Sequence, residues 1–335
     1  MPPKTQPIDP LASENHETLL RLHEELLRVR HAELALAERY KQQEMRTPTH
    51  FGVGQEAVAV GVCAALEKTD VAYSHHRSHN HFLAKGGSVY RLAAELFGRE
   101  TGCSRGRGGS VHLTDLSCGF VASSAILGEA MSAATGSALA FRLGNEKRIA
   151  TAFFGDAVAE EGAFYECLSY AALKKLPVLY VCENNGYATE SPLSIRQPAG
   201  ADISGRVASF GVRTIKAEGN DVLAVLTAAR EAVAYLRTEG TPVFLECATY
   251  RWLEHVGPFY DHELGRTYRT EQEVAGWQDK CPVIKSRAAI LEAGAADEAT
   301  LDKMQTDIQA VIQADIEKAY GDPWPDPQQL FDNIY

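Results

Sequence analysis

The 335-residue sequence has no paired-cysteine pattern, no long apolar run and no excess of basic charge. Its seven cysteines are an odd number, lie far apart and include no C-x-x-C pair, so we expect a reducing, cytoplasmic location. The 33 Lys and Arg residues stand against 44 Asp and Glu, and the net charge is −11. This balance argues against a general nucleic-acid partner and against binding to an anionic membrane. Any site that binds an anion must therefore depend on a few nearby positive or N–H groups, because the protein as a whole is negatively charged.

No stretch of the sequence has the length and apolarity of a membrane span. The segment poorest in charge, residues 118–141, is interrupted by Glu129 and is rich in Ala, Ser and Gly. We therefore predict that it forms a buried helix with close neighbours. Residues 1–15 contain neither an apolar run nor a basic leader, so we expect no signal or transit peptide there and interpret them as a flexible N-terminal arm.

Hydrophobic periodicity predicts an α/β fold. Apolar residues three and four apart predict helices at 17–41, 55–66, 89–97, 161–174 and 222–236. Short apolar runs predict buried strands at 148–154, 177–182, 212–216 and 243–249. This alternation is typical of a mostly parallel sheet flanked by helices. We expect a single α/β domain over residues 16–320 with helical extensions at both ends, followed by a tail at 321–335.

Three further segments have a distinctive composition. Residues 273–319 are predicted to be helical, with breaks at Pro282 and Gly294. Residues 74–81 read SHHRSHNH and are too polar to predict a core element. Residues 102–110 read GCSRGRGGS, which predicts a loop that offers backbone N–H groups to a partner or ligand. The loop lacks the Gly-Lys-Ser/Thr ending of a nucleotide P-loop, so we interpret it as an ordered support.

Two polar residues follow neighbouring predicted strands directly. Asp156 comes after the strand at 148–154, and Asn185 comes after the strand at 177–182. The 29 positions between them (185 − 156) match one βαβ unit of about 30 residues. Parallel strands end at the same edge of a sheet, so the carboxylate and the amide should meet there. With a backbone carbonyl, most plausibly that of Tyr187, they suit Mg²⁺, which prefers oxygen ligands.

These segments resemble the α subunits of pyruvate, branched-chain 2-oxo acid and acetoin dehydrogenases, which bind thiamine diphosphate. The family's diphosphate motif begins Gly-Asp-Gly and ends Asn-Asn; residues 155–162 here read GDAVAEEG and residues 176–187 read LPVLYVCENNGY. The third motif position is Ala157 rather than Gly. The resemblance extends to residues 54–57 (GQEA), 79–86 (HNHFLAKG) and 102–112 (GCSRGRGGSVH), in family order. It covers roughly residues 20–300 and implies the thiamine diphosphate-binding fold.

The resemblance assigns roles to individual residues. Metal ligands fall on Asp156, Asn185 and the carbonyl of Tyr187. Cofactor contacts fall on His76, Arg77, Leu127, Gly128, Gly155, Asp156, Ala157, Val158, Asn185, Tyr187 and His255. Arg77 would clasp the diphosphate, and His76 stands where the family commonly has Tyr. His50, His79 and His255 are candidate proton donors near the reacting carbonyl.

A loop near the C-terminal end departs from the family pattern. The family's Tyr-Arg-x-His-Gly-His-Ser appears here as YRWLEHVG at 250–257, which keeps His255 but replaces the first histidine with Leu253 and the serine with Val256. We therefore expect no phosphorylation of the kind known for that serine. Changed loops commonly accompany changed acceptors.

The resemblance also implies a reaction and partners. Thiamine diphosphate supplies the electron sink for decarboxylation of a small 2-oxo acid, most plausibly pyruvate. We expect a separate β-type subunit, an α₂β₂ heterotetramer, and transfer of the two-carbon unit to a lipoyl-domain protein.

Three alternatives remain. The two-carbon unit could pass without oxidation to a sugar or another carbonyl compound, as in a transketolase-like enzyme or a lyase. The chain could hold cofactor only to stabilise an assembly. His75, His76, His79 and His81 could form a zinc site, although no further ligand set is evident and the family resemblance explains Arg77 and His79 together.

Overall fold

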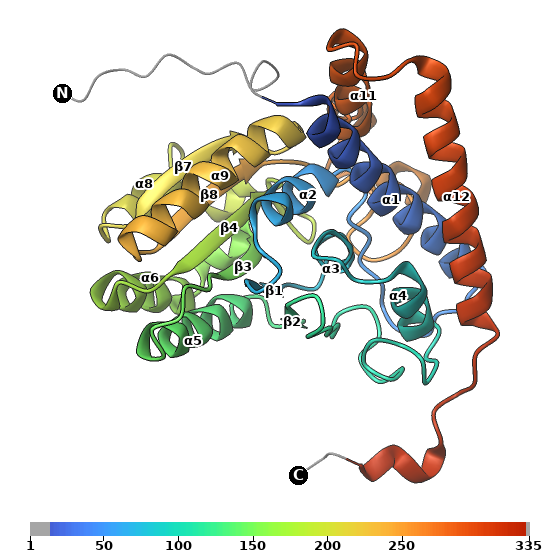
Figure 1. Ribbon diagram of the computed structural model, residues 1–335, viewed down its shortest axis with the longest axis horizontal. Helices are drawn as coiled ribbons and strands as arrows, with labels where there is room; N and C mark the ends of the chain where they lie inside the picture. Colours follow the sequence, from blue (N-terminus) through green and yellow to red (C-terminus); the bar gives the residue numbers. More distant parts are fainter. Residues whose placement is uncertain (1–13, 333–335) are drawn as a thin grey trace.

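A six-stranded parallel sheet forms the centre of the computed structural model, which describes residues 14–332 (Figure 1). The strand order is β2-β1-β3-β4-β8-β7, and every neighbouring pair is parallel. The strands are β1 (Val71–Ser74), β2 (Phe120–Ser123), β3 (Ala150–Gly155), β4 (Val178–Asn184), β7 (Arg213–Glu218) and β8 (Val243–Ala248). A separate antiparallel pair joins β5 (Tyr187–Ala188) to β6 (Ser191–Pro192). The α/β prediction with a mostly parallel sheet is confirmed.

Helices cover both faces of the sheet. They are α1 (His16–Lys41), α2 (Glu56–Ala65), α3 (His79–Ala84), α4 (Val89–Leu96), α5 (Glu129–Leu143), α6 (Gly162–Lys174), α7 (Leu193–Arg196), α8 (Ile203–Ala208), α9 (Val222–Glu239), α10 (Glu271–Gln278), α11 (Pro282–Glu292) and α12 (Glu298–Tyr320). Short 3₁₀ turns lie at Asp156–Glu160, Asp261–Leu264 and Pro327–Phe331. The helices α5 and α6 lie together in Figure 1, and the long helices α1 and α12 run side by side at the opposite end.

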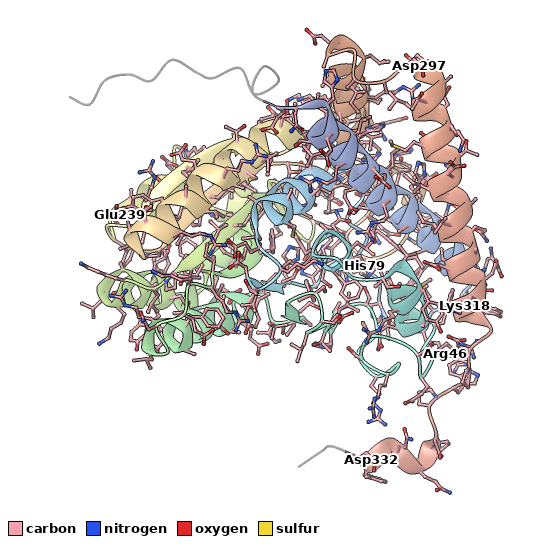
Figure 2. All side chains as sticks on the ribbon, in the orientation of Figure 1. Arg46, His79, Glu239, Asp297, Lys318 and Asp332 are labelled. Atoms are coloured by element: carbon pink, nitrogen blue, oxygen red, sulfur yellow. The ribbon has the colours of Figure 1, made fainter. Side chains whose placement is uncertain are left out.

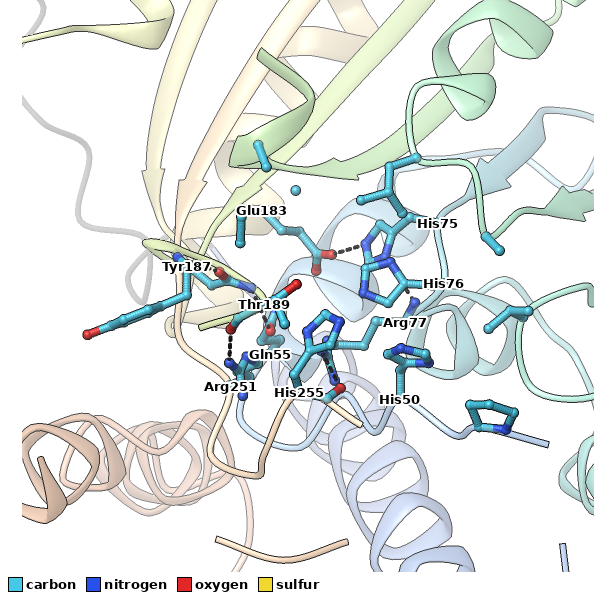
Figure 3. A pocket seen from close by; sticks show the side chains of 18 of the residues that line it. His50, Gln55, His75, His76, Arg77, Glu183, Tyr187, Thr189, Arg251 and His255 are labelled. Carbon is cyan, nitrogen blue, oxygen red and sulfur yellow. Dashed lines mark hydrogen bonds and ion pairs between the residues drawn. The ribbon is translucent and has the colours of Figure 1, made fainter. Parts of the chain in front are cut away.

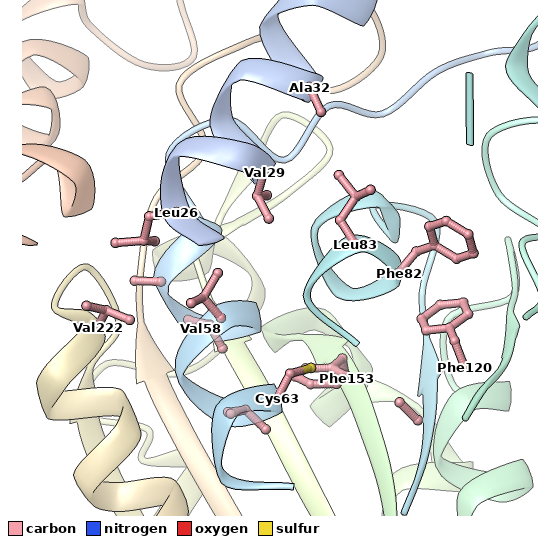
Figure 4. Close-up of a cluster of buried hydrophobic side chains, with 14 of the residues drawn as sticks. Leu26, Val29, Ala32, Val58, Cys63, Phe82, Leu83, Phe120, Phe153 and Val222 are labelled. Atoms are coloured by element: carbon pink, nitrogen blue, oxygen red, sulfur yellow. The ribbon is translucent and has the colours of Figure 1, made fainter. Parts of the chain in front are cut away.

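Two hydrophobic clusters pack against the two faces of the sheet. Consecutive strand residues point to opposite faces, and accordingly Phe153 joins one cluster while Phe154 joins the other. The first cluster includes Leu26, Val58 and Phe82 from the helices on its side of the sheet (Figure 4). The second contains the small residues of α5 together with residues of α6. None of the helices in residues 14–332 is long and apolar enough to cross a membrane.

The structure confirms most of the predicted elements, including the helix at 17–41 and the breaks at Pro282 and Gly294. One prediction is wrong in part: residues 118–141 contain strand β2 and a turn before the helix begins at Glu129. The predicted arm lies largely outside the described residues, as do the last three residues of the predicted tail.

The prediction for residues 74–81 is also wrong. We expected no core element there, yet its first residue ends β1, its last three begin α3, and seven of its eight residues are buried. Burying polar groups is costly unless they are hydrogen-bonded. The partners that make this burial possible, Glu33 and Glu183, come from distant parts of the chain.

Candidate functional site

A cavity of about 560 Å³ opens beside the carboxyl ends of β1, β3 and β4 (Figure 3). This volume is within the range of small-molecule sites. Its wall contains these residues predicted for the site: His50, His76, Arg77, Leu127, Gly155, Asp156, Ala157, Asn185, Tyr187 and His255. The βαβ arrangement therefore brings Asp156 and Asn185 to one cavity, as their spacing predicted.

Asp156 is the first residue after β3 and is only 1% exposed. Its Oδ2 accepts a hydrogen bond from the guanidinium of Arg196, which also donates to Glu160 at 2.5 Å. Burial raises the pKa of the Asp156 carboxyl, although Arg196 acts in the opposite direction. Because burial favours the protonated form of Asp156, a nearby positive charge is needed to stabilise its ionised form.

Asn185 is held in the cavity wall by its own neighbours. Its Oδ1 accepts from the backbone N–H of Tyr187 at 3.0 Å, and its Nδ2 donates to Oε1 of Gln55 at 3.3 Å. Asn184 turns away and donates to Glu246 at 2.8 Å. Only the second asparagine of the pair faces the cavity.

The donors at this end of the cavity fit a hard divalent cation. Asp156 offers a buried carboxylate and Asn185 an amide oxygen, and the turn through Tyr187 lines the same wall. Mg²⁺ takes oxygen ligands of this kind and completes its shell with phosphate and water. A cation at this position would have to displace the guanidinium of Arg196 from the Asp156 carboxylate.

Arg77 is largely buried in the cavity wall, and its side chain is hydrogen-bonded to two loops. Its guanidinium donates to the carbonyl of Phe51 at 2.5 Å and to the carbonyl of His255 at 3.1 Å. Burial, with the nearby Arg251, lowers the pKa of Arg77 to about 9. The side chain remains a cation at neutral pH and gives this part of the cavity a positive character.

Three histidines gather at the cavity. The ring of His50 lies 4.6 Å from that of His76 and 5.1 Å from that of His255, and the last two are 5.4 Å apart, centroid to centroid. Burial and the charge of Arg77 lower the pKa of His50 to about 2 and that of His255 to about 3. Burial likewise lowers the pKa of His76. All three imidazoles are neutral at physiological pH.

His79 does not line the cavity. It is fully buried, its Nδ1 contacts Oε1 of Glu33 at 2.6 Å and its Nε2 contacts Oγ of Ser110 at 2.9 Å. Figure 2 shows it among packed side chains, whereas Glu239, at the end of α9, lies at the rim of the molecule. Both ring nitrogens are engaged, so His79 supports the wall rather than facing a substrate.

Two other residues predicted to contact the cofactor also lie outside the cavity wall. Val158 is fully buried in the hydrophobic cluster that contains α5 and α6. Gly128 precedes α5, close to the carboxylate of Glu161. Leu127 and Ala157, their sequence neighbours, are the residues exposed to the cavity.

The sequence analysis did not identify a buried group of three residues, His75, His81 and Glu183, at the cavity wall. Nε2 of His75 lies 2.8 Å from Glu183, and Nε2 of His81 lies 3.3 Å from the other oxygen of that carboxylate. Burial opposes the charge on Glu183, but His81 and His75 outweigh it and lower the pKa of the carboxyl to about 2. These three residues connect the end of β1 and the start of α3 to β4, and His75 and Glu183 line the cavity. The sequence feature that could have indicated this group is Glu183, a charged residue at the end of a buried strand, directly before the Asn-Asn motif.

The glycine-rich loop at 102–110 donates backbone N–H groups to an anion, as predicted. This anion is a side chain of the protein itself, the carboxylate of Glu95. Four of these N–H groups donate to the buried carboxylate at 2.7–3.1 Å, from Ser104, Gly106, Gly108 and Gly109. Gly108 of the loop and Val111, just after it, line the cavity. It is an ordered support of the site, as we interpreted it.

The loop that departs from the family pattern is folded against the domain. Leu253 is 4% exposed and packs into the core, so its apolar character has a structural basis. Asp261 accepts from Arg269 and from Tyr268, both at 2.6 Å. This network holds the segment from which His255 faces the cavity.

Comparisons with known proteins agree with this geometry. Residues 24–328 match the family described as "Dehydrogenase E1 component". The chain is 34% identical over 326 residues to the α subunit of acetoin:2,6-dichlorophenolindophenol oxidoreductase from Bacillus subtilis (strain 168), covering 95% of this chain and 94% of that protein. It is 35% identical over 325 residues to the pyruvate dehydrogenase E1 component subunit α of Rhizobium meliloti (strain 1021), covering 97% and 92%. The mitochondrial counterpart from Solanum tuberosum is 36% identical over 320 residues, covering 95% and 79%.

Proposed function

Because the chain belongs to the dehydrogenase E1 component family as an α-type, thiamine diphosphate-dependent subunit, we propose that it takes part in decarboxylating a small 2-oxo acid, pyruvate in the first instance. The two-carbon unit would pass to a lipoyl group on a partner protein. The observation that carries the proposal is the meeting of Asp156 and Asn185 in one cavity with Arg77 and three neutral histidines.

In this proposal Asp156, Asn185 and the carbonyl of Tyr187 would hold Mg²⁺, which would offset the negative charge of the cofactor's diphosphate. The positive charge of Arg77 favours the same anion. Thiamine diphosphate supplies the electron sink for cleavage of the bond to the carboxylate. Leu127 and Ala157 line the cavity on the side of α5 and the first turn after β3.

In this proposal the cavity histidines donate protons to the reacting carbonyl group and accept protons from it. Imidazoles that are neutral at physiological pH can donate an N–H to a developing oxyanion and can also accept a proton. His50 and His255 approach from two different loops, so each can face one side of a bound carbonyl. Burial of the cavity wall strengthens these contacts by reducing competition from water.

The assembly follows from the subunit type. An α-type subunit of this family implies a β-type partner. We propose an α₂β₂ heterotetramer located in the cytoplasm, with the seven cysteines unpaired.

A specific observation supports a second candidate, transfer of the two-carbon unit to a sugar or another carbonyl acceptor without net oxidation. Leu253 and Val256 replace the polar positions of the family loop next to His255, and Leu253 packs into the core. The loop that carries His255 therefore lacks the histidine and the serine of the family pattern, and changed loops commonly accompany changed acceptors.

Turnover with defined acceptors tests the proposal. The α/β assembly receives pyruvate or another small 2-oxo acid with thiamine diphosphate and Mg²⁺, and then either lipoamide or a panel of sugar and carbonyl acceptors. Pyruvate consumption with lipoamide as the acceptor supports the dehydrogenase function. Consumption only with carbonyl acceptors supports the second candidate, and no consumption of any 2-oxo acid contradicts both.

A further inference from the structure

The last described residues of the chain return to the segment that leads into the glycine-rich loop. Helix α12 ends at Tyr320, whose ring lies 5.3 Å from that of Phe97 at the end of α4 (Figure 1). We call the residues that follow, 321–332, the C-terminal strap. The strap contains three aspartates and no basic residue, whereas residues 98–107 contain three arginines. The two segments are therefore complementary in charge.

The start of the strap is hydrogen-bonded to α4 and to the turn after it. One carboxylate oxygen of Asp322 accepts from the hydroxyl of Tyr90 at 2.5 Å and from the hydroxyl of Thr101. The N–H of Glu100 donates to the carbonyl of Pro323 at 3.0 Å. Because Tyr90 is on α4 and the other two residues follow that helix, the strap fixes the turn between α4 and the glycine-rich loop.

Trp324 covers the backbone on which the glycine-rich loop rests. The guanidinium of Arg99 lies 4.0 Å from the centre of its ring, an arrangement in which a cation is attracted to an aromatic face. The ring also packs against Gly98, where an added Cβ would lie 3.3 Å from the indole. On the other side of this backbone, an added Cβ at Gly106 would lie 2.6 Å from the carbonyl carbon of Gly98. The strap, the backbone at 98–99 and the loop are therefore in successive contact.

The end of the strap contacts the loop directly. The guanidinium of Arg107 donates to the carbonyl of Gln329 at 2.9 Å and lies 3.5 Å from the carbonyl of Asp332. A guanidinium presents several N–H groups in one plane, so it can join two neighbouring carbonyls. Arg107 immediately precedes Gly108, which lines the cavity. The strap thus reaches to within one residue of the cavity wall.

The opposite side of the loop is held by buried groups. Glu95 accepts four of the backbone N–H groups of the loop. The hydroxyl of Ser110, at the end of the loop, contacts Nε2 of His79 at 2.9 Å. These inner contacts leave the exposed side of the loop, at residues 105 and 107, to be supported from outside. A displacement of that side would move Gly108 and with it the cavity wall.

We propose that the C-terminal strap positions the glycine-rich loop against the cofactor cavity, with Trp324 and Arg107 as positioning residues. Neither side chain lines the cavity, so each acts through the loop backbone. A wall that is supported on both sides keeps its geometry before the cofactor arrives, and binding then costs less order. This inference deepens the proposed function, and its cofactor-binding readout rests on that function.

Hydrogen exchange of the loop tests the proposal without cofactor. Exchange is followed by mass spectrometry in the α/β assembly for peptides that cover residues 102–110 and, as an internal reference, strand β4. Trp324→Ala and Arg107→Gln should each speed exchange in the loop by about tenfold, because the loop opens locally more often. Exchange in β4 should stay unchanged, which shows that the domain remains folded.

Conservative and control variants separate positioning from general damage. Trp324→Phe keeps an aromatic face and Arg107→Lys keeps a cation, so both should restore most of the protection of the loop. Arg213→Gln removes an exposed arginine paired with Glu231 and should exchange as the unmodified chain does.

The affinity for thiamine diphosphate is the second readout. Trp324→Ala and Arg107→Gln should weaken Mg²⁺-dependent binding by about tenfold, since a misplacement of about 1 Å by a distant substitution can cost about 100-fold in catalysis. Unchanged loop exchange in both variants, or faster exchange with unchanged cofactor affinity, overturns the proposal. If the unmodified assembly binds no thiamine diphosphate, the proposed function fails, and loop exchange alone decides whether the strap holds the loop.

Discussion

The guanidinium of Arg196 donates a hydrogen bond to the carboxylate of Asp156, the residue proposed to bind Mg²⁺. Arg196 ends the four-residue helix α7, and the same side chain reaches Glu160 at 2.5 Å. Arg196 and the proposed Mg²⁺ would therefore compete for one buried carboxylate. Binding of the cation is expected to move Arg196 towards Glu160 or away from both acids.

Removing that competitor should strengthen cation binding. We predict that Arg196→Gln lowers the Mg²⁺ concentration needed for thiamine diphosphate binding by about tenfold, since a charge close to a carboxylate shifts its ionisation by 1–3 pKa units. Calorimetric Mg²⁺ titration at fixed thiamine diphosphate measures this. The control is Arg213→Gln, which removes an exposed arginine paired with Glu231. An unchanged Mg²⁺ requirement in Arg196→Gln would show that the ion pair does not oppose binding.

The glycine-rich loop depends on one carboxylate. Replacing Glu95 with Gln removes the charge and one acceptor oxygen from a group that receives four backbone N–H donors and is 1% exposed. We predict a loss of about 2–4 kcal/mol in the free energy of unfolding, because buried donors lose their charged acceptor. Urea denaturation measures the loss. Exposed Glu166→Gln serves as the control, and equal stability of the two variants contradicts the role of Glu95.

A buried histidine far from the cavity should make stability depend on pH. Burial, with the charge of Arg287, lowers the pKa of His23 to about 4. The unfolded chain, with a histidine pKa near 6.5, binds more protons between about pH 4 and 6.5. The contribution of His23 is therefore complete above about pH 6.5 and is lost as the pH falls towards 4, by at most about 3 kcal/mol at 1.36 kcal/mol per pKa unit.

Replacement of that histidine tests the sign of the effect. His23→Gln should flatten the fall of unfolding free energy between pH 6.5 and 4, measured by denaturation at several pH values. The exposed histidine variant His262→Gln should keep the slope of the unmodified chain. A slope that stays the same in His23→Gln means that other groups cause the acid sensitivity.

The parts of the site that follow from local patterns were predictable from the sequence. Asp156 and Asn185 each come directly after a buried strand, and the edge of a parallel sheet brings such residues together. The amphipathic pattern of α1 and the glycine-rich composition of the 102–110 loop likewise indicated their structures.

The parts that depend on distant partners were not predictable in this way. His75 and Glu183 are 108 positions apart, so no local pattern indicates that the polar segment at 74–81 is buried. The family resemblance makes His79 a candidate proton donor, but its contact with Glu33 on α1, 46 positions away, removes it from the cavity. Arg196 contacts Asp156 across 40 positions and a turn whose course no periodicity indicates.

Calorimetry of thiamine diphosphate binding tests the central claim most directly. The α/β assembly is titrated with thiamine diphosphate in the presence of Mg²⁺, and again with the divalent ion removed by EDTA. We predict saturable binding that requires Mg²⁺ and that Asp156→Asn weakens by more than about 100-fold, since one of the few protein ligands of the ion loses its charge. The exposed variant Asp202→Asn should bind as the unmodified chain does. Equal affinity with and without Mg²⁺, or full binding by Asp156→Asn, would contradict the account.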